Sequence, residues 1–248
     1  MLFLAIWSGG CSATKLTDVL TTDQETLQRI RAMNLLEHNA ALAPIESQIA
    51  KQKIADEETE RLMEVDTKAL AIRMVEVFRA NNVFKKIERI SPKDNSQKAL
   101  IKESRSKKAT LLMRVTLKKA RVYSLGGNDA ALGNTAMWLM LGIPSLWGAD
   151  ISYGVEIVAE VSFLDVASSP DFATLLHSYE YTFKGEGGMN YLERSGSLAV
   201  IVMPPQYCPD DLDKVKETVL PLAQEQFTLK LAEQTKKELG RERVSEPR

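Results

Sequence analysis

Three long segments in the second half of the chain alternate apolar with polar residues. They cover residues 111–122, 151–165 and 175–184. An alternation with a period of two is typical of β-strands that bury one face and expose the other. The turn-forming run 168–171 (Ser-Ser-Pro-Asp) separates the second segment from the third, so we expect these two strands to form an antiparallel hairpin.

Apolar residues at helical spacing predict helices before and after these strands. One helix is predicted from Thr67 to Ala80, capped by the side chain of Asp66 and ended by Asn81 and Asn82. A short strand within 83–90 and a short helix over 97–106 are predicted next. A long helix is predicted to open at 209–211, with an inner face made by Leu212, Val215, Val219, Leu222 and Phe227.

Together these elements predict an α+β domain over residues 66–239, a mostly antiparallel sheet with helices packed on one face. Within it, the glycine-rich residues 185–197 predict a loop, and the apolar residues 198–203 predict a short last strand. Residues 22–65 predict a helical N-terminal segment, a hairpin or arm, in front of the domain. Residues 240–248 predict a flexible tail.

A short apolar stretch at the N-terminus ends on a cysteine. Residues 1–10 read Met-Leu-Phe-Leu-Ala-Ile-Trp-Ser-Gly-Gly, and Cys11 follows them. An apolar core followed by small residues is typical of a signal peptide, and this one is much shorter than the roughly 20 apolar residues that span a bilayer. The basic residues that open such peptides are missing, which a start codon farther upstream would explain. The alternative is a cytosolic protein that begins with a buried strand or helix.

These residues resemble the lipobox of bacterial lipoproteins, in which a peptidase cuts before a cysteine that then carries a diacylglycerol. The resemblance implies that Cys11 is a lipid anchor and that residues 11–21 are a lipidated tether. Such a lipid holds a domain on a membrane at about 0.8 kcal/mol for each buried CH₂ group. The residue after Cys11 is Ser12, which is not acidic. By the family rule, this implies that the protein is located at the outer membrane and faces the periplasm.

The order of elements over about 67–239 resembles a group of envelope lipoprotein domains. The cues are the helix end at 81–84 (Asn-Asn-Val-Phe) and the loop 142–144 (Gly-Ile-Pro) that feeds the strand 151–165. The group contains the curli-secretion lipoprotein, the penicillin-binding-protein activator lipoproteins and the N-terminal domain of TolB. The resemblance implies a protein that works by contact rather than by turnover. The first strand usual in the group has no predicted counterpart before Thr67, where helix is expected.

The most apolar stretch of the domain is 137–147, which holds two of the three tryptophans of the chain. It is too short to span a membrane as a helix. The simpler interpretation is a short buried helix between two strands. The functional interpretation is a loop that docks on lipid or on a partner, because Trp and Met are favoured at such surfaces. The candidate docking residues are Trp138, Met140, Leu141 and Trp147.

Composition argues against several other classes of function. The net charge is −1, so no overall field draws the chain toward nucleic acid. The two histidines, His38 and His177, are too few and too far apart to predict a metal site, and no cofactor motif occurs. If Cys11 carries a lipid, we expect the second cysteine, Cys208, to be a buried thiol.

A catalytic interpretation rests on Glu156 and Glu160, which share a predicted strand face with Ser162. Two carboxylates on one face can act in acid–base chemistry, although an outward strand face is more often only solvated.

Taken together, the sequence predicts a membrane-anchored, non-enzymatic binding or assembly component of the bacterial envelope, with an envelope protein as its partner. The alternatives are a subunit of an oligomeric secretion or pore complex, with homo-oligomers as its form, and a soluble enzyme of unknown reaction.

Overall fold

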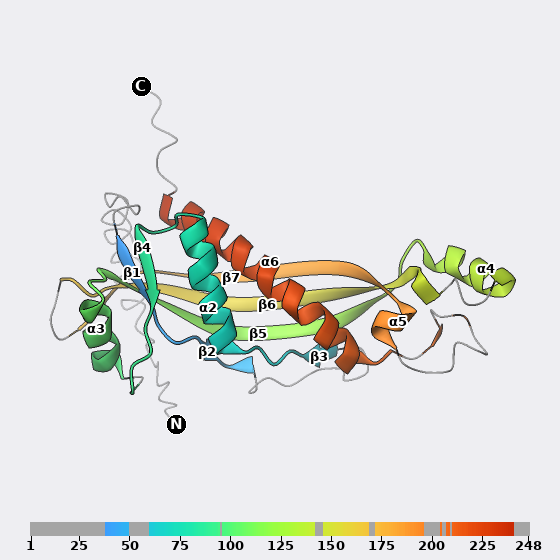
Figure 1. The fold of residues 1–248 in the computed structure, drawn as a ribbon, viewed down its shortest axis with the longest axis horizontal. Coiled ribbons are helices and arrows are strands. Elements are labelled where there is room, and N and C mark those ends of the chain that lie inside the picture. The colour runs from blue at the N-terminus through green and yellow to red at the C-terminus, as the bar shows by residue number, and fades with distance from the viewer. Residues whose placement is uncertain are drawn as a thin grey trace, which may run out of the picture.

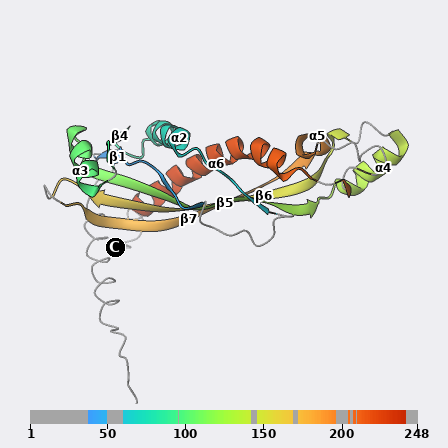
Figure 2. The same ribbon diagram turned by 90° about the horizontal axis from the view of Figure 1, so that it is seen from below.

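Two long helices cover one face of a single mixed sheet in the computed structural model (Figures 1 and 2). The fold class is α+β, as the sequence predicted. The structure describes residues 38–49, 60–94, 96–141, 146–168, 172–195, 204, 207–208 and 210–240. The predicted signal peptide, Cys11, the tether and the strand predicted at 198–203 therefore lie outside the described residues.

Three long antiparallel strands form most of the sheet. They are β5 (Leu111–Gly127), β6 (Ala149–Asp165) and β7 (Thr174–Asn190), and β6 pairs with both of its neighbours along nearly its full length. The predicted hairpin is thus confirmed. A register shift at Phe163 and Leu164 turns Leu176 toward the core and leaves Leu175 51% exposed, where strict alternation predicted the reverse.

The other edge of β5 pairs with three short strands in turn. β1 (Asn39–Leu42) and β2 (Glu46–Ser47) run parallel to β5, and β3 (Glu60–Leu62) runs antiparallel to it. The helical arm predicted over 22–65 is therefore wrong at these three segments. β1 also supplies the strand before the Thr67 helix that the sequence did not reveal. It is a short strand paired on both sides, and such strands lack the alternation that identifies a half-exposed strand.

Helices connect the parallel strands, because a parallel pair needs a crossover. α2 (Thr67–Ala80) leads into β4 (Lys86–Arg89), which pairs with β1, and α3 (Gln97–Ser106) leads into β5. The carboxylate of Asp66 caps α2 by accepting hydrogen bonds from the backbone N–H groups of Lys68 (2.9 Å) and Ala69 (3.1 Å). Asn82 follows the end of α2 with a φ of 50°, in the left-handed region, as predicted.

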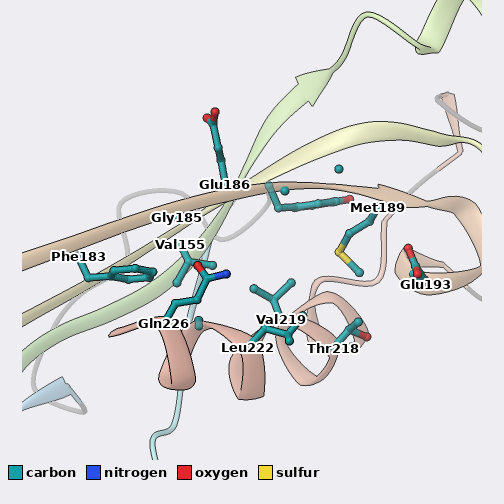
Figure 3. A pocket seen from close by; sticks show the side chains of 14 residues that line it. Val155, Phe183, Gly185, Glu186, Met189, Glu193, Thr218, Val219, Leu222 and Gln226 are labelled. Atoms are coloured by element: carbon teal, nitrogen blue, oxygen red, sulfur yellow. The ribbon is translucent and has the colours of Figure 1, made fainter. Parts of the chain in front are cut away.

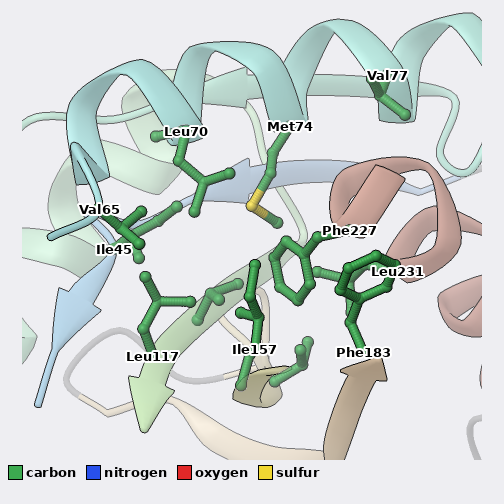
Figure 4. Close-up of a cluster of buried hydrophobic side chains, with 14 of the residues drawn as sticks. Ile45, Val65, Leu70, Met74, Val77, Leu117, Ile157, Phe183, Phe227 and Leu231 are labelled. Carbon is green, nitrogen blue, oxygen red and sulfur yellow. The ribbon is translucent and has the colours of Figure 1, made fainter. Parts of the chain in front are cut away.

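The main core lies between the sheet and the helices α2 and α6 (Leu212–Gly240) (Figure 4). Aromatic rings join α6 to β7: the centroid of Phe227 lies 6.0 Å from that of Tyr181 and 6.3 Å from that of Phe183. Leu222, predicted on the inner face of α6, is instead 62% exposed. The short helix α3 packs in a second, smaller cluster. The strand residues of this cluster alternate with those of the main core, so they belong to the other face of the sheet; they include Ala41, Leu112 and Leu164.

The loop predicted at 185–197 is wrong for its first part. β7 continues to Asn190, and the short helix α5 (Tyr191–Arg194) follows directly. Gly185 pairs with Val155 and Gly187 with Tyr153 of β6. Glycine is depleted in strands, but a long and continuous partner strand holds this segment in the sheet. The sheet therefore reaches well beyond the part covered by α2 (Figure 1).

Candidate functional site: an uncharged apolar arm

The chain between β5 and β6 forms a helix, α4 (Ala131–Leu141), at the end of this long strand pair. In both ribbon views α4 projects past the end of the sheet, away from α2 and from the main core (Figures 1 and 2). We call α4 together with Trp147 the apolar arm. It contains all four residues that the sequence singled out for docking.

Large apolar side chains of the apolar arm lie open to solvent. Leu132 is 83% exposed, Leu139 71% and Met140 82%, and Trp147 is 61% exposed. Residues 137–141 are helical, as in the simpler interpretation, but that interpretation is wrong about burial between two strands. Trp138 and Met140 lie on this helix and not on the loop of the functional interpretation. Helices with so little charge normally lie inside a core, so the exposure itself is the unusual property.

The predicted docking residues differ in their surroundings. Met140 and Trp147 are exposed, Trp138 is half-buried, and Leu141 is the last residue of α4. Leu132 and Leu139, among the most exposed residues of the arm, were not among the predicted docking residues. A signal for them exists in the sequence, since no charged residue occurs between Asp129 and Asp150. A surface helix of a soluble domain usually carries charges on its outer face.

Polar side chains at the base of the arm fix it to the sheet. Asn134 is 4% exposed, and its Nδ2 donates a hydrogen bond of 2.8 Å to the carbonyl of Gly148. Asn128 donates from Nδ2 to the carbonyl of Ala149 (3.0 Å) and accepts from the N–H of Ala130 (2.9 Å). A Cβ at Gly148 would lie 2.1 Å from the Asn134 side chain, so any larger residue there would displace the Asn134 amide from its place. The arm is thus held in a defined position.

A buried ion network lies beside this base. Arg194 of α5 has no exposed side-chain surface, and it donates to the carboxylate of Asp150 at 3.3 and 3.4 Å and to that of Asp210. The hydroxyl of Tyr153 donates to the second oxygen of Asp210. The backbone carbonyl of Asp150 accepts a hydrogen bond of 3.0 Å from the N–H of Asn128. The network therefore ties α5 and Asp210, two residues before α6, to the strand β6 that carries the arm.

Burial and the neighbouring carboxylates have opposite effects on the pKa of Arg194 but act in the same direction on that of Tyr153. Burial alone would lower the pKa of Arg194, but the charges of Asp210 and Asp150 outweigh it, and the pKa is raised. Burial, followed by the hydrogen bond to Asp210, raises the pKa of the Tyr153 hydroxyl. Both groups therefore keep their protons across the physiological range. The network therefore serves as a fixed structural link.

The sheet face opposite α2 and α6 carries ion pairs. Glu156 receives Lys119 Nζ at 2.9 Å and Arg121 Nε at 2.8 Å, and Glu160 lies 3.0 Å from Lys118 Nζ. The hydrogen bond from Lys119, reinforced by Arg121, lowers the pKa of Glu156. The structure thus gives each carboxylate of the catalytic interpretation a cationic partner.

Replacing Glu156 with Gln should weaken the pH dependence of stability in acid. A carboxylate with a lowered pKa stabilises the fold above its ordinary value of 4.5 and loses that contribution as the pH falls through its folded value. The wild-type free energy of unfolding should therefore fall more steeply below pH 4.5 than that of Glu156→Gln, as measured by urea denaturation. Glu186→Gln, at an exposed position on β7, is the matched control. Equal slopes for wild type and Glu156→Gln would contradict the role given to this pair.

Cys208 is buried, as predicted, and burial raises the pKa of its thiol. No three His, Cys, Asp or Glu side chains in the described parts of the chain gather closely enough to hold a metal ion. No helix in them combines the length and the apolar character that a membrane crossing requires.

No protein-family model matches the sequence, and no curated protein matches it either. Several solved structures are similar in part. They include a neuraminyllactose-binding hemagglutinin homolog from Helicobacter pylori, with a TM-score of 0.42 and 10% identity over 85% of this chain and 89% of that one. A PelC dodecamer from Paraburkholderia phytofirmans gives a TM-score of 0.37 and 9% identity, covering 82% and 88% of the two chains. The rare lipoprotein B from Shewanella oneidensis gives 0.31 and 10%, covering 81% and 94%.

Proposed function

We propose that this chain is a membrane-anchored lipoprotein of the bacterial envelope, facing the periplasm at the outer membrane, and that it binds or assembles with a partner protein. The observation that carries the binding role is the apolar arm, an exposed and uncharged helix held in a fixed position. The cysteine after a short apolar stretch supports the anchor, with the lipid on Cys11. In this proposal the protein acts by contact and catalyses no reaction.

The arm has the chemistry of a contact surface. Exposed apolar patches on soluble domains mark sites for partners, and Met and Trp adapt well to such contacts. Covering Leu132, Leu139 and Met140 removes apolar area from water at about 25 cal/mol for each Å². No charge has to be stripped of water in the process, because the stretch between Asp129 and Asp150 contains none. The arm can therefore contribute to binding over most of its exposed surface.

Site-specific photo-crosslinking in cells tests the binding role directly. A photoreactive residue at Leu139 should give a discrete protein adduct, and the same residue at Thr182, exposed on β7, should not. An adduct with a second copy of the chain would instead favour the oligomeric alternative. No adduct at Leu139 or at Met140 would contradict the arm as a protein-binding surface.

A triple variant should separate binding from folding. Leu132, Leu139 and Met140 are exposed, so changing all three to Gln, a good helix former, should alter the free energy of unfolding by no more than about 1 kcal/mol. The crosslink from Trp147 should nevertheless be lost. Urea denaturation and the yield of adduct are the two measurements. A large loss of stability would show that these side chains pack in a core.

A further inference from the structure

A cavity of about 210 Å³ lies between β7 and α6, apart from the apolar arm (Figure 3). Tyr153 and Val155 of β6 and Phe183 and Met189 of β7 line it on the sheet side. The facing residues of α6 are Thr218, Val219, Leu222, Ala223 and Gln226. Its volume exceeds the roughly 150 Å³ of an engineered apolar cavity that holds benzene, so it has room for a small ligand.

The cavity exists because β7 lacks inward side chains at two positions. Its other inward positions in this part of the strand carry large groups, among them Tyr181, Phe183 and Met189. At Gly185 an added Cβ would lie 3.1 Å from the Phe183 ring, so packing within the protein accounts for that glycine. At Gly187 an added Cβ would meet no atom within 4 Å. The fold therefore leaves the space beside Gly187 unfilled.

The walls of the cavity are mostly apolar, and the described residues that form them carry no positive charge. Val155, Val219 and Leu222 point toward its interior, whereas the carboxylate of Glu186 points away (Figure 3). No Lys or Arg occurs among the described residues that line it, and Glu193 is the other carboxylate. Leu222 lies at the cavity with 62% of its surface exposed, so an apolar ligand would cover it. These properties favour an uncharged apolar ligand over an anionic one.

The shape of the cavity favours a chain over a ring. The α6 residues that line it run from Thr218 to Gln226, about 12 Å at the rise of an α-helix. A single chain laid along α6 can contact the whole of this stretch, whereas one ring cannot. We propose that this cavity binds one unbranched hydrocarbon chain, the tail of an amphiphile with an uncharged head group. This inference goes beyond the proposed function and depends on neither Cys11 nor the arm.

A series of n-alkanols, titrated into the full chain by calorimetry, tests the proposal. Each buried CH₂ group should tighten binding about fourfold, so affinity should rise steadily from butanol upward. It should level off once the chain fills the cavity. Decanoate should bind at least tenfold more weakly than decanol, because the charged side chains that line the cavity, Glu186 and Glu193, are both carboxylates. Toluene binding as tight as that of the best alkanol would contradict a site for a chain.

Two variants fill the cavity from opposite walls. Gly187→Leu and Ala223→Leu should each weaken decanol binding at least tenfold, because the added side chain takes the space of the ligand. Thr182→Leu, on the exposed face of the same strand, should leave binding unchanged. Circular dichroism verifies that each variant is folded. Undiminished binding in a folded cavity-filling variant, or no saturable binding to the wild type, would overturn the proposal.

Discussion

Replacing Arg194 with Met should lower the free energy of unfolding by about 3–5 kcal/mol, a large share of the stability of a typical domain. Arg194 and Asp150 both have fully buried side chains. Without the guanidinium, the carboxylate of Asp150 is left in the protein interior with no counter-charge. Urea denaturation at neutral pH measures the loss. The crosslink from the apolar arm should also weaken, because Asp150 helps to hold Asn128 at its base.

An exposed ion pair provides the control for Arg194. Arg73 lies 2.8 Å from Glu225, but the two side chains are 47% and 50% exposed, so Arg73→Met should cost only about 0–1 kcal/mol. Adding Asp150→Asn to Arg194→Met should restore part of the lost stability, since it removes the uncompensated charge. If Arg194→Met is no more destabilising than Arg73→Met, the network does not have the structural role assigned to it.

Replacing Cys11 with Ala should move nearly all of the protein from the membrane fraction to the soluble fraction. A single acyl chain binds a bilayer only marginally, whereas a multiply acylated cysteine anchors stably. The apolar arm, with 11 helical residues, offers no comparable anchor. Cell fractionation and immunoblotting measure the change, and the triple Gln variant of the arm is the control that should stay with the membrane. Membrane retention of Cys11→Ala would contradict the anchor.

The long strands and capped helices could be predicted because their signals are local. Alternation identifies β5 and β6, and Asp66 and Asn82 mark the two ends of α2. β1 could not be found in this way, because a four-residue strand between two parallel partners shows no alternation. The glycines of β7 are in a strand only because β6 extends beside them. Pairing between distant segments decides both cases.

The sequence likewise revealed the parts of the candidate site that have local signals and missed the parts that depend on tertiary structure. Its tryptophans and methionines were evident as an apolar cluster, but an apolar helix is normally buried, and only the structure places α4 beyond the sheet. The ion network joins Asp150, Arg194 and Asp210 from separate parts of the chain, so no spacing could reveal it. The cavity beside Gly187 depends likewise on how α6 crosses β7.

The central claim is that the chain is tethered to a membrane through a lipid on Cys11, and metabolic labelling with a fatty acid tests it most directly. The gene would be expressed with its own upstream region in a bacterial host, beside Cys11→Ala. The wild type should incorporate the label and the variant should not, since the proposed diacylglycerol is joined to the protein through a thioether at the Cys11 Sγ. A wild-type chain without label would contradict the claim and leave an α+β domain whose apolar arm needs another explanation.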